Sequence, residues 1–523
     1  MTQNRRIALN VVATYGRSLL ALFCGIFTSR WALQALGVKA YGVYAVTGVI
    51  ITMMSLINGL FSVSVSRFFA VAVGKVKAAN TGEDALEDCR RWFSVAVLIH
   101  LALPIVLIAI GAPIGFWAIE NYFVIPPEHL STSYWVMGFA IVTAFVSMAS
   151  VPFNAMFTAR QEIAEMTLYS IISTVARFVL TYILLSYNGN RLWFHAFCCM
   201  LISFIPSFLI VFRAFRVFPE CVLRRKYMFD LKRAKDLFSF TGWLCVGSVS
   251  MTTQVQGMVT VVNKFLGIEF NSSMNIADAV VGNSTALSNS LTGAFSPAIQ
   301  NAVGAGDRKA YEKFSVNACK FGTLLCALFV CPLCLETDYV IGIWLVNPPP
   351  MVAPLASLLL ISMLIDRTCS GLISAIHAHG RIMLHEVMNS VVWIAGLAIG
   401  WHLIAQCGMS ILVVAWVRMS IIVILIVQRV FLWKYQLGFA VRPWLFGFLV
   451  PATFAIVASM GVGFLLRCRM DPSFIRLAVC TVAQVLTMSV LSYLFVLSNE
   501  DRAFVCARLF ALAGRLKGAR GNG

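Results

Sequence analysis

Arg17 is the first residue of this sequence whose chemistry stands out, because it interrupts a long apolar run near the N-terminus. A guanidinium inside an apolar segment needs water, a carboxylate or an anionic ligand. Its planar fork of N–H donors suits phosphate, which it can hold through paired hydrogen bonds. Arg17 therefore predicts an anion-binding site. Asp278 is predicted to be a counter-ion for such an arginine, a proton-titrating group or a residue at a helix end.

Smaller polar residues recur at helical spacing in four of the apolar segments. They share one face of each predicted helix at about 3.6 residues per turn. Such a face is typical of an aqueous cavity or of the small-residue packing seams found in membrane bundles. We expect the four helices to line one aqueous cavity. The candidate substrate-binding residues are Asn10, Thr14, Arg17, Ser18, Ser55, Asn58, Ser62, Gln256, Asn263, Asp278, Thr285 and Asn289.

Motifs for covalent chemistry or metal binding are nearly absent from the sequence. There is no G-x-x-x-x-G-K-[ST] loop for nucleoside triphosphates, and Cys331-Pro-Leu-Cys334 lacks the context of a redox motif. His377, His379 and His385 lie close together, but no cysteine or carboxylate set completes a metal site around them. We therefore expect no enzymatic activity, no catalytic residue, no cofactor and no bound metal.

The segments that must position these residues are membrane-spanning helices. Of 523 residues, 60% are hydrophobic and 12% are charged, whereas about a quarter of a soluble domain is charged. The apolar blocks have the length of about 20 residues that crosses a bilayer core. We predict an all-α integral membrane protein with about 14 transmembrane helices. They lie near 8–33, 41–66, 92–119, 132–157, 164–187, 193–214, 237–263, 272–299, 314–335, 351–376, 386–406, 409–432, 443–466 and 474–497.

The net charge of +18 comes mostly from Lys and Arg in short loops between the apolar blocks. This is the positive-inside pattern of membrane proteins, so we expect no nucleic-acid partner. The distribution predicts a multi-pass protein with both termini in the cytoplasm. The 15 cysteines are odd in number and lie mostly within apolar blocks, a pattern that does not indicate a disulfide framework.

An internal repeat divides the chain into two halves. Leu36-Gly37-Val38 recurs as Leu266-Gly267-Ile268, and Ala72-Val73-Gly74 recurs as Ala302-Val303-Gly304, both at an offset of 230 residues. Parallel repeats place a transport site at the interface between halves. We predict two parallel six-helix lobes plus a C-terminal helix pair. The parts are an N-lobe at 1–216, a basic cytoplasmic linker at 217–236, a C-lobe at 237–432, appended spans at 443–497 and a basic cytoplasmic tail at 498–523.

Three stretches near the N-terminus carry a family resemblance. They are TSRWALQALGVKAYGVY at 28–44, the segment 58–69 that begins NG and ends SRFF, and VPFNA at 151–155. They resemble bacterial polysaccharide-biosynthesis flippases, of the oligosaccharide or O-antigen type, in the multidrug/oligosaccharidyl-lipid/polysaccharide exporter superfamily. The resemblance implies a two-lobed, V-shaped transporter of the bacterial inner membrane. Its substrate would be an undecaprenyl-diphosphate-linked oligosaccharide, flipped from the cytoplasmic to the periplasmic leaflet.

The implied partners are that lipid-linked oligosaccharide, the membrane lipids and the polysaccharide polymerase machinery. A lipid II flippase or a multidrug exporter of the same superfamily is an alternative, although a carboxylate would serve a cationic drug better than Arg17 does. A membrane-bound polysaccharide polymerase or ligase is a further alternative. Such an enzyme needs a sizeable periplasmic loop with acid and base residues, and the longest gaps on that side are the short stretches 120–131 and 336–350. Transport by alternating access is therefore favoured.

Overall fold

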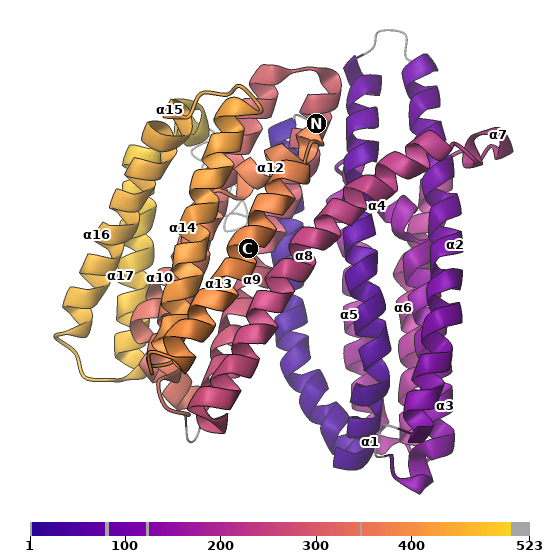
Figure 1. Ribbon diagram of the computed structural model, residues 1–523, viewed down its shortest axis with the longest axis horizontal. Helices are drawn as coiled ribbons and strands as arrows, with labels where there is room; N and C mark the ends of the chain where they lie inside the picture. The colour runs from indigo at the N-terminus through magenta and orange to yellow at the C-terminus, as the bar shows by residue number, and fades with distance from the viewer. Residues whose placement is uncertain (1–2, 79–82, 122–124, 346–347, 504–523) are drawn as a thin grey trace, which may run out of the picture. The chain divides into compact units, whose positions relative to one another are not determined.

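The computed structural model describes residues 3–78, 83–121, 125–345 and 348–503, and every secondary-structure element in these ranges is a helix (Figure 1). The predicted all-α class is confirmed. The predicted tail lies outside the described residues from position 504 onward. The helices are α1 Gln3–Ala78, α2 Glu83–Asn121, α3 Pro127–Ala149, α4 Val151–Ala159, α5 Ile163–Ser186, α6 Arg191–Val217, α7 Arg225–Met228, α8 Leu231–Leu266, α9 Ile268–Ala305, α10 Arg308–Trp344, α11 Val352–Arg367, α12 Ser370–His379, α13 Met383–Ala405, α14 Leu412–Tyr435, α15 Arg442–Trp444, α16 Val450–Arg467 and α17 Phe474–Leu491, with π-helical turns at Leu445–Leu449 and Ser492–Val496.

The predicted number of about 14 transmembrane helices is not confirmed. Within the described residues, 11 helices are long and apolar enough to cross a membrane, or 12 if α11 and α12, bent by 47°, form one broken span. The predicted spans 237–263 and 272–299 correspond to α8 and α9, which do not meet this criterion. Their many Ser, Thr, Gln and Asn side chains make them too polar, although they are as long as the other spans.

The sequence repeat is also a structural repeat. Gly37 has a φ of 75° at the kink inside α1, and Gly267 has a φ of 95° between α8 and α9. Glycine adopts positive φ without the steric penalty of a Cβ, so each position joins two helices at a sharp change of direction. The fourth span of each repeat is broken as well, at Ser150 between α3 and α4 and at 368–369 between α11 and α12. The two repeats therefore have helix breaks at corresponding positions.

The chain forms two compact units. The first unit comprises Met1–Ser248, Asn289–Phe314 and Ser374–Glu386, and the second comprises the remainder. Helices α8, α9, α10, α12 and α13 each contribute one end to the first unit and the rest to the second. The first unit is thus larger than the predicted N-lobe, because ends of later helices pack with the first repeat.

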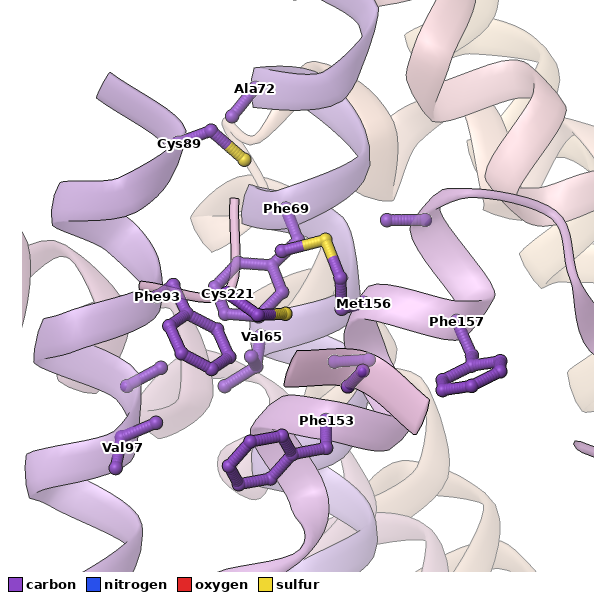
Figure 2. Packing of buried hydrophobic residues seen from close by; sticks show 14 of the residues in the cluster. Val65, Phe69, Ala72, Cys89, Phe93, Val97, Phe153, Met156, Phe157 and Cys221 are labelled. Atoms are coloured by element: carbon purple, nitrogen blue, oxygen red, sulfur yellow. The ribbon is translucent and has the colours of Figure 1, made fainter. Parts of the chain in front are cut away.

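Aromatic and aliphatic side chains, most of them from α1, α2 and α4, form a buried core cluster in the first unit (Figure 2). Phe69 of α1, Phe93 of α2 and Met156 of α4 are completely buried. The ring centroids of Phe93 and Phe153 lie 5.4 Å apart in an edge-to-face arrangement. Because lipid is as apolar as these side chains, close packing rather than transfer from water stabilises the contact. This core fixes the second half of α1 against α2 and α4.

The predicted linker at 217–236 packs on the first unit. Glu220 is fully buried and forms an ion pair with Arg160 at the end of α4. Asp230 pairs with Arg233, which also contacts a carboxylate of α2. Burial raises the pKa of Asp230, but hydrogen bonds from the backbone and side chain of Arg233 outweigh this effect and lower it. The linker is thus held to the ends of α2 and α4 by charge pairs.

Candidate transport site

Arg17 lies half-buried on the first half of α1. Among the residues that the structure describes, none forms a hydrogen bond or an ion pair with its guanidinium. The neighbouring hydroxyls are engaged locally: Thr14 Oγ1 donates to the Asn10 carbonyl at 2.6 Å, and Ser18 Oγ donates to the Thr14 carbonyl at 3.0 Å. The predicted polar face of α1 therefore presents a cation that the described protein does not neutralise.

Asn10, at the start of this face, is only 1% exposed. Its Nδ2 donates to the Gln161 carbonyl at 2.9 Å, and its Oδ1 accepts from the Ala164 backbone N–H at 3.0 Å. The two ends of the amide therefore tie α1 to the turn between α4 and α5 and to the first turn of α5, which gives Asn10 a structural contact in this arrangement.

The other uncharged candidate residues differ in accessibility. Asn58 and Ser62 are half-buried, and Asn58 Nδ2 donates to Ser147 Oγ at 3.4 Å. Thr285 Oγ1 donates to Met363 Sδ at 3.0 Å within the second unit. Exposed polar side chains in a membrane span require water or another polar group. The exposed candidates are Ser55 and Asn289 in the first unit, and Gln256 and Asn263 in the second.

Asp278 forms an ion pair with Arg418, a residue that the sequence analysis did not associate with it. Its Oδ1 accepts a hydrogen bond of 2.7 Å from Nη1 of Arg418 on α14. The side chains are 26% and 12% exposed, respectively. Arg418 Nε and Nη2 are buried without a hydrogen-bond partner in the described part of the chain. The sequence did not reveal this partner, because the two residues are 140 positions apart on different helices.

Two further ion pairs lie within the second unit. Arg429 Nη1 donates to Asp366 Oδ1 at 2.7 Å, and Arg476 Nη2 donates to Glu336 Oε2 at 2.7 Å. Glu336 is fully buried, and the side chain of Arg476 is 7% exposed. Charges buried this deeply are retained in a membrane when they are paired.

The ends of α1 and α9 meet through four residues of the first unit, which we call the glycine crossing: Val71, Gly74, Asn301 and Gly304. A Cβ at Gly74 would lie 2.2 Å from the Asn301 carbonyl oxygen, and one at Gly304 would lie 2.0 Å from the Val71 carbonyl oxygen. The repeat offset of 230 relates Gly74 to Gly304 and Val71 to Asn301. The crossing is therefore a symmetric pair of backbone contacts that only glycine permits.

Side chains extend this contact to two further helix ends. Asn301 Nδ2 donates to the Ala159 carbonyl at the end of α4, at 3.1 Å, and Arg67 Nε donates to the His377 carbonyl on α12, also at 3.1 Å. A cavity of about 310 Å³ lies beside the crossing, and its lining includes Arg6 and Lys77. The sequence identified the two glycines as parts of a repeat, whereas their contact depends on the packing of the helices.

The architecture is similar to that of solved membrane transporters. No family model matches the chain, and no curated protein matches it either. Solved transporters of the MOP superfamily have a similar structure. One from Pyrococcus furiosus, described as having a binding pocket of reverse polarity, gives a TM-score of 0.67 at 11% identity, covering 82% of this chain and 96% of that one.

A multidrug resistance MATE family transporter in an outward-facing conformation gives a TM-score of 0.67 at 12% identity, covering 82% of this chain and 94% of that one. A MATE structure in the bent conformation gives a TM-score of 0.69 at 11% identity, covering 82% of this chain and 95% of that one. At these identities the similarity shows the fold. The chain has the two-lobed, all-helical fold of MATE transporters.

Proposed function

We propose that this protein is a membrane transporter that flips an undecaprenyl-diphosphate-linked oligosaccharide from the cytoplasmic to the periplasmic leaflet by alternating access. The observation that carries the proposal is Arg17, a half-buried cation with no partner among the described residues. A guanidinium holds a diphosphate through paired N–H donors, while the polyprenyl tail remains in lipid. Exposed polar side chains of the same unit, Ser55 and Asn289, would bind the hydroxyls of the sugars.

The pairing of the acidic residues supports an anionic substrate over a cationic drug. A cation exporter needs an available carboxylate, but Asp278, Asp366 and Glu336 each accept a hydrogen bond from an arginine in the second unit. Arginine at 2.7 Å neutralises each of these carboxylates in a low-dielectric setting. The free charge on the predicted site is therefore positive.

The glycine crossing supports the alternating-access part of the proposal. The contacts at the crossing and beside it are made to backbone carbonyls, including those of Ala159 and His377. These contacts can break without leaving an unpaired carboxylate in a membrane span. By the distribution of Lys and Arg, this end of the helices is the one predicted to face the cytoplasm. We propose that the crossing closes the cytoplasmic side of the path and opens when the substrate enters.

Complementation of surface polysaccharide in a flippase-deficient strain tests the function. We expect Arg17→Ala to abolish complementation, because Ala cannot bind the diphosphate, and Arg17→Lys to retain part of it, because Lys keeps the charge but loses the planar fork. Arg30→Ala is the matched control, since Arg30 lies on the same helix and its side chain is exposed. Membrane levels are compared by immunoblot.

Efflux of a fluorescent organic cation in the same strain distinguishes the alternative. We expect the wild-type chain to give no more cation efflux than the empty vector. Efflux that survives in Arg17→Ala, together with absent complementation by the wild-type chain, would replace the flippase proposal with multidrug export.

A further inference from the structure

The turn between α12 and α13 brings two histidines and a glutamate together. His377 lies in the last turn of α12, and His385 and Glu386 lie in the first turn of α13. Gly380, with a φ of 92°, allows the chain to reverse within the three residues that separate the helices. One potential ligand atom from each of the three side chains lies within 4.8 Å of the other two.

From this geometry we infer that His377, His385 and Glu386 form a binding site for a divalent transition-metal ion of the zinc type. Two imidazoles and one carboxylate are the donor set of an open tetrahedral zinc site, which leaves a fourth position for water. Mg²⁺ and Ca²⁺ prefer oxygen ligands, so the two nitrogen donors favour zinc, cobalt or nickel.

The distances are those of a nearly assembled site. His377 Nε2 lies 3.2 Å from Glu386 Oε1. Two ligands of a tetrahedral ion with bonds of about 2.0–2.2 Å are separated by about 3.3–3.5 Å, so this pair already has the spacing it needs. The rings of His377 and His385 are in edge contact, with centroids 5.6 Å apart. The third ligand atom, on His385, lies within 4.8 Å of the other two, so it must move closer to them when an ion binds.

Burial distinguishes this cluster from a solvated group of surface side chains. His385 is 2% exposed and Glu386 is 5% exposed. A bound cation between the buried side chains would stabilise the charge of this carboxylate. The side chain of His377 is 22% exposed, so an ion can reach the site from solvent.

Neighbouring helices hold the ligands in place. A Cβ at Gly247 of α8 would lie 1.9 Å from Glu386 Oε2, so the carboxylate packs directly against the backbone of Gly247. The His377 carbonyl accepts from Arg67, which fixes the end of α12. The same guanidinium places a positive charge near the site, so we expect affinity to be lower than in a site without it. The sequence predicted no metal because the carboxylate that completes the set, Glu386, was not associated with the histidines.

Metal analysis of the purified full-length protein in detergent tests the inference. After equilibration with Zn²⁺ and removal of free metal, we expect about one more zinc per chain in the wild type than in His385→Gln or Glu386→Gln. His379→Gln is the matched control, because His379 lies in the same turn, is exposed and is outside the cluster. Blocking accessible thiols first removes the background from exposed Cys407 and Cys468.

Co²⁺ titration of the unaltered wild-type chain provides a second measurement that does not depend on the folding of a variant. We expect the visible absorption of tetrahedral Co²⁺ to appear with thiols blocked and to disappear on addition of Zn²⁺. Equal zinc content in all four proteins, or a wild-type chain that gives no such absorption, would overturn the site.

Discussion

Both units contain arginine–carboxylate pairs, such as Arg160 with Glu220 in the first unit, but they differ at Arg17. In the second unit, Arg418, Arg429 and Arg476 each donate to a carboxylate at 2.7 Å. In the first unit, Arg17 has no described partner, and Arg177 donates to the Ser203 hydroxyl at 2.7 Å rather than to an acid. Buried pairs resist separation because each would leave an uncompensated charge. Such pairs hold helices of the second unit together, whereas Arg17 of the first unit is the cation that we propose binds a ligand.

The same difference extends to the contacts between distant helix ends. In the glycine crossing, Gly74 and Gly304 pack against backbone carbonyls, and the side chains of Arg67 and Asn301 donate hydrogen bonds to backbone carbonyls. Water can form hydrogen bonds with these carbonyls when the contact opens. A contact that, as we propose, forms and breaks in every transport cycle is better made in this way than by a buried ion pair.

Breaking a buried pair of the second unit should have the largest effect. Glu336→Gln leaves Arg476 buried without its carboxylate, which is expected to destabilise the folded protein by about 3–5 kcal/mol. Asp338→Asn is the control, because Asp338 pairs with Arg467 but is 67% exposed, and it should cost at most about 1 kcal/mol. Thermal melting in detergent measures both, and equal melting temperatures would contradict a rigid role for the buried pair.

Adding a methyl group at the crossing should disturb closure. Gly304→Ala places a Cβ against the Val71 carbonyl, which is expected to cost about 1–3 kcal/mol in the closed state. A reporter cysteine at buried Ala302, in a Cys-depleted chain, should then react about 5- to 150-fold faster with a hydrophilic thiol reagent. Gly293→Ala, with open space around its Cβ, should leave the rate unchanged. The same rate in both variants would rule out a steric role for Gly304.

Asp278→Asn tests a partly accessible pair. The variant removes the charge that Arg418 faces, and a stability loss of about 1–3 kcal/mol is expected from losing a hydrogen bond between charged groups. The double variant Asp278→Arg with Arg418→Asp should recover part of this loss, because the opposite charges are restored in exchanged positions. The single variants Asp278→Arg and Arg418→Asp are measured beside it. If the double variant loses more melting temperature than the two single variants lose together, the pair is not the source of the stability.

Arg17→Ala should have the smallest effect on stability. Because Arg17 has no described partner, its removal is expected to change the free energy of unfolding by no more than about 0.5 kcal/mol. Thermal melting of the purified variant beside Asp278→Asn measures this. A loss as large as that of Asp278→Asn would mean that Arg17 has a structural partner and is not kept for a ligand.

Local patterns in the sequence predicted the membrane class, the repeat and the polar face of α1. The offset of 230 residues is realised at Gly37 and Gly267, where each repeat needs a residue with positive φ. Ion pairs such as Asp278 with Arg418 were not predicted, because their partners are set by helix packing and not by spacing. The count of spans was too high by the hydropathy criterion because polar faces make α8 and α9 unlike ordinary apolar spans.

The most direct test of the account is a flipping assay with the purified protein in liposomes. An undecaprenyl-diphosphate-linked oligosaccharide would be placed in one leaflet, and its appearance in the other would be followed by binding of a lectin. We expect faster transfer with the wild type than in protein-free vesicles, transfer at the protein-free rate with Arg17→Ala, an intermediate rate with Arg17→Lys and the wild-type rate with Arg30→Ala. Transfer by Arg17→Ala at the wild-type rate, or no transfer by the wild type, would contradict the assignment of Arg17 to the diphosphate.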